Sequence, residues 1–181
     1  MYEFNDGITL LQGDITKETT DAIVNAANPS LLGGGGVDGA IHRAGGPELL
    51  DECRKIRETQ FPDGLPTGEA VYTGSGKLPC TWVIHTVGPF WRGGFSDEET
   101  LLKKSYTACL DSAKMLGAKS ISFPAISTGV YGYPKERAAI AAFSAVKEWL
   151  AQNSGGMAIR FVLFSKADLD TFATVYKALY G

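Results

Sequence analysis

The sequence predicts a three-layer α/β fold in which helices cover both faces of a largely parallel, buried sheet. Short apolar runs rich in Val, Ile and Phe alternate with segments of helical periodicity along the whole chain. This alternation is typical of parallel sheets whose strands are connected by helices. The chain has 181 residues, of which 44% are hydrophobic and 20% are charged. These values are ordinary for a globular protein, so we expect a single domain spanning residues 1–181.

Six segments are predicted to form the strands. Each is short and apolar, and most are bounded by glycine, proline or polar residues. They are Ile8–Gln12, Ala22–Asn25, Glu69–Thr73, Trp82–Val87, Ser120–Pro124 and Ile159–Phe164. Because only a short link containing Gly-Ser-Gly joins the third and fourth runs, we expect these two strands to form an antiparallel pair.

Five segments have helical periodicity and are predicted to be helices: Val37–Ala44, Pro47–Arg57, Asp97–Leu116, Lys135–Ala151 and Ala167–Leu179. The third of these helices has the clearest end signals. Ser96 is the expected N-cap, and the three acidic residues after it suit the first turn, where the helix dipole favours negative charge. Gly117 is the expected C′ residue.

Composition argues against several classes of protein. The formal net charge is −3, and no basic stripe is present, so nucleic acid is not expected as the main partner. Glycine, proline and polar residues interrupt the apolar stretches, so no membrane span is expected. The N-terminal residues lack the basic start and apolar run of a secretory signal, which favours a cytoplasmic location.

Cysteine and histidine spacing does not indicate a metal site. Cys53, Cys80 and Cys109 form no Cys-x-x-Cys pair, and His42 and His85 have no metal-ligand spacing. We therefore expect three reduced thiols, no bound metal and no cofactor.

Two glycine-rich loops are the most informative local feature. Gly33–Gly36 lie in the loop after the second predicted strand, and Pro124–Pro134 form the loop after the fifth. Both loops follow a strand and precede a helix, so both belong at the carboxyl edge of the sheet, where α/β folds bind ligands. Backbone N–H groups at a helix N-terminus bind phosphate without a cationic side chain. Two such loops predict a diphosphate between them.

The residues of these loops disfavour two other classes of nucleotide-binding loop. Neither loop ends in Gly-Lys-Ser/Thr, so a nucleoside triphosphate loop is disfavoured. No Gly-x-Gly-x-x-Gly is followed by an acidic residue at the spacing of a dinucleotide-binding fold. The remaining alternative is that each loop is a structural turn that caps a helix.

At these residues the chain resembles the macro domain family, and specifically its bacterial O-acetyl-ADP-ribose deacetylase branch. Five segments match in the family's order: Gln12–Thr16, Ile23–Pro29, Gly33–His42, Val83–Pro89 and Phe123–Gly132. The resemblance implies a mixed, mostly parallel six-stranded sheet between helices, with ADP-ribose lying across its crest. The inserted Cys/His zinc motif of another macro branch is absent.

Twelve residues are predicted to contact the substrate: Asp14, Ile15, Asn25, Gly35, Gly36, Val37, Ser127, Thr128, Gly129, Val130, Tyr131 and Phe164. Asp14 resembles the acid that accepts the adenine amino group, a role that suits a carboxylate. The two loop segments resemble the family's phosphate and ribose contacts. Phe164, at the end of the last strand, is the candidate for stacking on adenine. The alternatives are an N-cap or turn role for Asp14 and a buried position for Phe164.

Asn28 and Asp38 resemble the pair that the deacetylase branch uses at the distal ribose. Asn28 would hold a ribose hydroxyl, and Asp38 would orient or deprotonate the attacking water. Asp38 lies near the start of a helix, where the dipole favours its anion and is expected to make it a weaker base. Two alternatives remain: Asp38 as a stabilising first-turn acid, and water activation by the substrate's own phosphate. His42, about one turn after Asp38, is expected to pack or to form a hydrogen bond.

The resemblance implies a hydrolase that deacetylates O-acetyl-ADP-ribose and removes mono-ADP-ribose esters from acidic side chains. Its implied partners are ADP-ribose, O-acetyl-ADP-ribose and ADP-ribosylated proteins. The alternative is a binding module that recognises ADP-ribose without cleaving it, because glycine loops account for affinity and not for chemistry.

Overall fold

A computed structural model describes all 181 residues. The chain forms one sheet of seven strands in the order β1-β2-β7-β6-β3-β5-β4. The five inner strands are parallel, and the two edge strands, β1 and β4, are antiparallel to their neighbours. The bounds are β1 Tyr2–Glu3, β2 Ile8–Gln12, β3 Ala22–Ala26, β4 Ala70–Gly74, β5 Trp82–Thr86, β6 Ser120–Phe123 and β7 Ala158–Leu163.

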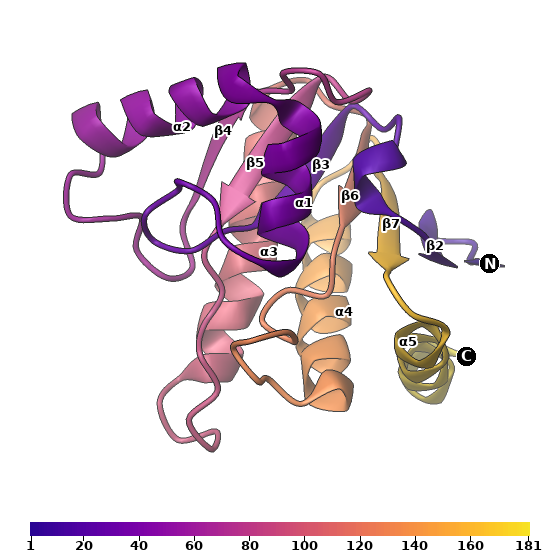
Figure 1. The fold of residues 1–181 in the computed structure, drawn as a ribbon. Coiled ribbons are helices and arrows are strands. Elements are labelled where there is room, and N and C mark those ends of the chain that lie inside the picture. The colour runs from indigo at the N-terminus through magenta and orange to yellow at the C-terminus, as the bar shows by residue number, and fades with distance from the viewer.

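Helices cover both faces of the sheet, which confirms the predicted three layers (Figure 1). The helices α1 and α2 lie on one face, and α3, α4 and α5 pack together on the other. A short 3₁₀ helix, η1, follows β2. The bounds are η1 Ile15–Lys17, α1 Gly36–Gly45, α2 Pro47–Thr59, α3 Glu98–Met115, α4 Lys135–Gln152 and α5 Lys166–Tyr180.

The core is unequal on the two faces. A cluster of 31 buried residues lies mainly between the sheet and α3, α4 and α5, whereas a cluster of 8 lies between the sheet and α1 and α2. The larger cluster contains a group of aromatic rings around Phe161, with Phe143 edge-on at 5.2 Å and Phe123 stacked at 5.7 Å between ring centroids. The strands β2, β6 and β7 therefore pack against the larger part of the core.

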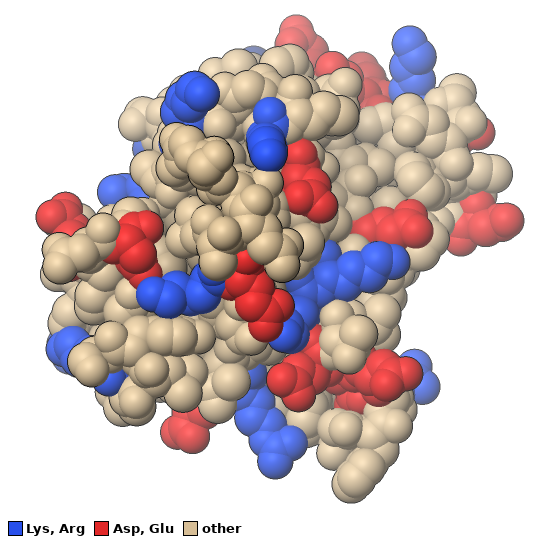
Figure 2. Space-filling view, turned by 180° about the vertical axis from the view of Figure 1, so that it is seen from behind, with Lys and Arg blue, Asp and Glu red and all other residues tan.

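The predicted elements are confirmed, and their ends agree with the structure within two residues. Residues Trp82–Thr86 pair antiparallel with β4, as the short link predicts. No helix combines the length and the apolarity needed to cross a bilayer. On the face that Figure 2 presents, basic and acidic side chains are interspersed and form no broad basic area.

Two expectations about the elements were wrong. The sheet has seven strands rather than six, because Tyr2 and Glu3 pair with Leu10 and Thr9 at the edge of β2. A two-residue strand is too short to produce a periodic pattern. The helix α3 is not capped by Ser96: its N-cap is Asp97, which is in the left-handed conformation with a φ of 58° and makes no side-chain capping bond.

Candidate functional site

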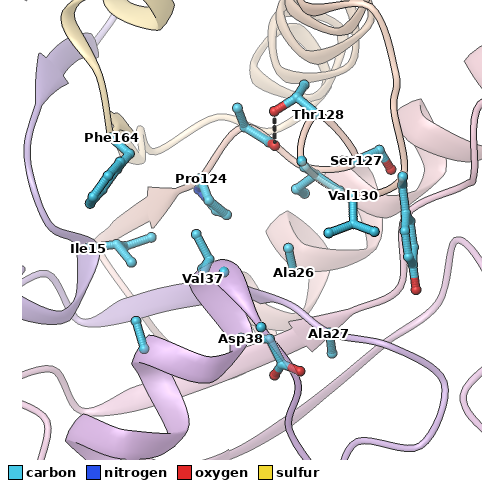
Figure 3. Close-up of a pocket in the computed structure, with 18 of the residues that line it drawn as sticks. Ile15, Ala26, Ala27, Val37, Asp38, Pro124, Ser127, Thr128, Val130 and Phe164 are labelled. Carbon is cyan, nitrogen blue, oxygen red and sulfur yellow. Dashed lines mark hydrogen bonds between the residues drawn. The ribbon is translucent and has the colours of Figure 1, made fainter.

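A cleft of about 770 Å³ lies at the carboxyl ends of β2, β3, β6 and β7 (Figure 3). Connections that follow these four strands form its walls, so the chain brings together the two glycine-rich loops as the sequence predicts. Thirteen of the fourteen predicted site residues line it: Asp14, Ile15, Asn28, Gly35, Gly36, Val37, Asp38, Ser127, Thr128, Gly129, Val130, Tyr131 and Phe164.

Asn25 is the exception, because it does not line the cleft. Its side chain is fully buried, and its amide Nδ2 donates to Asp38 Oδ1 at 2.8 Å. Asn25 therefore supports Asp38 from behind. The matched motif placed Asn25 near the site but gave no information on which way its side chain points.

Asp14 caps η1 and also lines the cleft. Its Oδ1 accepts from the backbone N–H of Thr16 at 2.9 Å and from the Thr16 hydroxyl at 2.7 Å, so Asp14 caps η1. The hydroxyl hydrogen bond is the main cause that lowers the pKa of Asp14. The other oxygen, Oδ2, takes part in neither bond. The exposed Asp14 carboxylate remains ionised and lines the cleft.

Phe164 follows β7 directly, and 82% of it is exposed. The alternative of a buried Phe164 is therefore wrong. Figure 3 shows its ring and Ile15 at one side of the pocket, away from Asp38. An exposed aromatic ring at the wall of a cleft provides a surface on which a flat ligand group can stack.

The loop after β6 is held in a strained conformation. Ser127 has a φ of 69°, and its hydroxyl is buried without a hydrogen-bond partner. Its side chain approaches Gly88 so closely that a Cβ on Gly88 would overlap Ser127 Oγ. Thr128 Oγ1 donates to Ala125 O at 2.8 Å. Ser127 thus lines the cleft, while its hydroxyl oxygen is buried against Gly88 and unpaired.

The segment between β5 and α3 braces this loop. The ring of Phe90 stacks on Tyr131 with 3.7 Å between centroids, and the N–H of Trp91 donates to the Tyr131 carbonyl at 2.9 Å. The buried Glu98 carboxylate accepts from the backbone N–H groups of three residues of the segment, Arg92, Gly94 and Ser96. Although desolvation opposes them, these bonds lower the pKa of Glu98 to about 2.

Asp38 lies in the first turn of α1 and is only 5% exposed. His42 Nε2 lies 3.4 Å from Asp38 Oδ1, on the same oxygen that Asn25 contacts. Burial raises the pKa of Asp38, and the Asn25 hydrogen bond and the charge of His42 offset this only in part. This direction is opposite to the one expected from the helix dipole, because desolvation outweighs the Asn25 hydrogen bond and the charge of His42.

Asn28 and Asp38 converge on Gly34. A Cβ placed on Gly34 would lie 3.1 Å from both Asn28 Nδ2 and Asp38 Oδ2. Asn28 Oδ1 accepts two hydrogen bonds from Ser30, and Nδ2 donates one to Gly33 O at 2.9 Å. An amide has two N–H groups, so Asn28 keeps one donor beside the Asp38 carboxylate.

Two basic side chains that were not predicted from the sequence also line the cleft. They are Arg43 of α1 and Lys135 of α4. Lys135 Nζ lies 2.5 Å from Asp168 Oδ1, another lining residue. Lys135 is the first residue of α4, where the helix dipole disfavours a cation. That unusual placement was the available signal. No group of three or more Asp, Glu, His or Cys residues is arranged to hold a metal ion.

The fold and the cleft are those of a known protein family. The family model described as "Macro domain" matches residues 24–142, which is more than half of the chain. The chain therefore belongs to the macro domain family, and its mixed α/β/α sandwich is the macro domain fold.

Individual relatives are close in sequence and structure. "O-acetyl-ADP-ribose deacetylase 1" of Pantoea vagans is 53% identical over 91% of this chain and 95% of its own. The Oceanobacillus iheyensis macrodomain, solved with ADP, is 47% identical with a TM-score of 0.93, over 98% of this chain and 94% of that one. The Trypanosoma brucei macrodomain, solved in complex with ADP-ribose, is 40% identical with a TM-score of 0.83, over 93% and 68%.

Proposed function

We propose that this chain binds ADP-ribose in the cleft and hydrolyses the ester of O-acetyl-ADP-ribose. One observation carries the chemical part of the proposal. The Asp38 carboxylate is buried at the cleft wall with a raised pKa, beside the free N–H of Asn28. A carboxylate that is a stronger base than usual suits proton abstraction from water at neutral pH.

The binding part is supported by two glycines that the folded protein does not itself require. Gly35 and Gly129 have no positive φ, and a Cβ on either would meet no protein atom within 4 Å. Neither backbone strain nor internal packing accounts for glycine at these positions. The space beside them is part of the cleft, so the absence of a side chain favours close approach of a ligand to the backbone.

The proposed ligand extends from one end of the cleft to the other. Adenine stacks on Phe164 and donates its amino N–H to Asp14, the pyrophosphate accepts from backbone N–H groups of the two glycine-rich loops, and the distal ribose lies at Asn28 and Asp38. The start of α1 and the loop after β6 both line the cleft, and a helix N-terminus is a favourable site for phosphate. The structure of the Trypanosoma brucei relative in complex with ADP-ribose supports this choice of ligand.

The proposed reaction needs only water as a second reactant. Asp38 removes a proton from a water molecule, whose oxygen forms a bond to the acetyl carbonyl carbon. The ester bond to the ribose oxygen then breaks, and Asp38 returns the proton to that oxygen. The products are ADP-ribose and acetic acid, which ionises to acetate. The Asn28 N–H holds the ribose hydroxyl that neighbours the ester.

A mono-ADP-ribose ester on an Asp or Glu side chain of a protein contains the same type of bond. We therefore propose such modified proteins as a second class of substrate for the same residues. The name of the Pantoea vagans relative supports the acetyl ester, and the protein ester is an extension based on its chemistry.

The test compares Asn28→Ala and Asp38→Ala with the unmodified protein, measuring acetate release and calorimetric binding of ADP-ribose. Both variants are expected to bind ADP-ribose and to lose most of the turnover. Asp51→Ala is the control, because Asp51 is exposed and pairs only with Arg54 on the surface. Turnover that survives in both variants would make the catalytic assignment wrong. Binding of ADP-ribose by the unmodified protein without acetate release would make the chain a reader.

A further inference from the structure

A row of buried polar side chains connects Asp38 to the sheet behind it. Asn25 and His85 are fully buried and lie directly opposite each other in the register of β3 and β5. The Asn25 amide Nδ2 lies 2.8 Å from Asp38 Oδ1 and 3.0 Å from His85 Nδ1. Neither Asn25 nor His85 lines the cleft. Their side chains therefore do not contact a ligand in the cleft directly, and Asn25 contacts Asp38, which does line it.

The hydrogens of this row have one consistent arrangement. The two N–H groups of the Asn25 amide point to Asp38 and to His85 Nδ1, so Nδ1 is an acceptor and the imidazole proton is on Nε2. That Nε2 lies 3.0 Å from Thr73 Oγ1. The Thr73 hydroxyl donates to Gly74 O at 2.9 Å, which leaves its oxygen free to accept. Every donor in the row points to an acceptor.

The imidazole of His85 remains neutral in this position. Burial, with a smaller contribution from the charge of His42, lowers the pKa of His85 to about 3. Nδ1 therefore stays an acceptor throughout the neutral pH range. A protonated His85 would turn Nδ1 into a donor and remove the partner that fixes the Asn25 amide.

The Asn25 carbonyl oxygen has no partner in this arrangement of the amide. Asn25 Oδ1 is buried and has no hydrogen-bond partner. Rotating the amide would place this oxygen against the Asp38 carboxylate, with two acceptors facing each other. An unpaired buried acceptor is unfavourable. The hydrogen bonds of the two N–H groups, to Asp38 and His85, therefore determine how the amide is oriented.

We propose that Asn25 and His85 are positioning residues that orient the Asp38 carboxylate for its reaction with water. Asn25 occupies Oδ1, and Oδ2 remains free toward Gly34 and Asn28. His85 acts one step further back, because it fixes the Asn25 amide, and Thr73 fixes His85. The inference rests on the proposed hydrolase function and assigns to it residues that do not touch the ligand.

The experiment measures kcat for O-acetyl-ADP-ribose, calorimetric binding of ADP-ribose, and the pKa of Asp38 by ¹³C NMR of its carboxylate. In Asn25→Ala, kcat is expected to fall about 10- to 100-fold, the cost of a misplaced reacting group, while binding changes little. The pKa of Asp38 should rise, because the Asn25 hydrogen bond lowers it. The nearby titratable groups on other elements, Cys53 and Tyr131, are left unchanged.

Two variants of His85 separate positioning from packing. His85→Gln can still accept from Asn25 and donate to Thr73, so it should retain most of the turnover, whereas His85→Leu should lose it. This pair also decides the question if Asn25→Ala does not fold. Ser122→Ala is the matched control, because Ser122 is a fully buried polar residue of β6 bonded to Glu18 and Thr20 and not to Asp38. It should lower thermal stability without moving the pKa of Asp38.

The outcomes are distinct. If the unmodified protein releases acetate and both Asn25→Ala and His85→Leu leave kcat and the pKa of Asp38 unchanged, the positioning role is overturned and the proposed function stands. If the unmodified protein releases no acetate, the proposed hydrolase function is wrong. A role of Asn25 and His85 in that reaction is then wrong as well. The NMR titration would still report whether Asn25 sets the pKa of Asp38.

Discussion

Two carboxylates in the same cleft have opposite surroundings. Asp14 is exposed, and the hydrogen bonds from Thr16 lower its pKa. Asp38 is 5% exposed, and burial raises its pKa in spite of the Asn25 hydrogen bond. One acid therefore holds its charge firmly, and the other binds a proton more readily.

The surroundings, and not the residue type, therefore decide what a carboxylate can do. An exposed anion with one oxygen free is suited to accept a hydrogen bond from a ligand group. A buried anion with a raised pKa is suited to take a proton. In the proposed function, the cleft has a binding end around Asp14 and Phe164 and a chemical end around Asp38 and Asn28.

The largest expected effect is at the chemical end. Asp38→Asn keeps the shape of the side chain and its acceptor for Asn25 but removes the base. We expect kcat for O-acetyl-ADP-ribose to fall about 100- to 10,000-fold, the usual contribution of general base catalysis. Binding of ADP-ribose should change little. Acetate release and calorimetry measure the two quantities, and an equal loss of kcat in Asp14→Asn would contradict the assignment of the base to Asp38.

The next effect is on affinity at the binding end. Phe164→Ala removes the surface proposed for adenine stacking, which is worth about 1–3 kcal/mol per base, so the Kd for ADP-ribose should rise roughly tenfold. Thermal stability should hardly change, because the ring is 82% exposed. Phe95→Ala is the control, since Phe95 is 96% exposed and does not line the cleft. Equal Kd values in the two variants would remove Phe164 from the site.

A smaller effect on affinity is expected at Asp14. Asp14→Asn replaces an acceptor by a donor and should weaken ADP-ribose binding by about 1 kcal/mol, the net value of one hydrogen bond. The hypoxanthine analogue of ADP-ribose lacks the amino group, so the unmodified protein should bind it more weakly than ADP-ribose. The variant should lose this preference. Calorimetry with both ligands tests the assignment, which fails if the unmodified protein does not distinguish them.

The smallest effect is on stability and depends on pH. Because the folded-state pKa of Asp38 is raised above its ordinary value, the folded protein binds the proton more readily than the unfolded chain. The ionised side chain therefore costs stability, and this cost grows as pH rises through the folded-state pKa. Asp38→Asn should raise the free energy of unfolding by about 1 kcal/mol at neutral pH.

At low pH, where Asp38 is protonated in both states, this stability difference should disappear. Denaturant titrations of the two proteins across the acid range measure it. Asp14 gives the opposite sign: its lowered pKa contributes stability at neutral pH that is lost as pH falls through the folded-state value. A gain in Asp38→Asn that is independent of pH would contradict the account.

The sequence predicted the elements well because their periodic patterns are long, and it failed where a feature has no pattern. The strand at Tyr2–Glu3 has two residues and cannot alternate measurably. The N-cap lies at Asp97 rather than at Ser96, and the Ser96 N–H donates to the Glu98 carboxylate, as do those of Arg92 and Gly94. These bonds depend on the three-dimensional path of the loop.

The site was predicted in outline, since the two loops follow neighbouring strands and must meet at one edge of the sheet. The sequence could not reveal that Asn25 points behind the cleft, because a motif fixes position along the chain and not the direction of a side chain. For the basicity of Asp38 it indicated only the effect of the helix dipole. The burial that raises the pKa of Asp38 requires the packed structure.

A crystal structure of the unmodified protein with ADP-ribose tests the division of the cleft most directly. The account predicts adenine against Phe164, with its amino group at Asp14, and the distal ribose about 3 Å from the Asn28 amide and next to Asp38 Oδ2. The reversed orientation, with adenine at Asp38, would contradict it, as would a distal ribose out of hydrogen-bond reach of both Asn28 and Asp38.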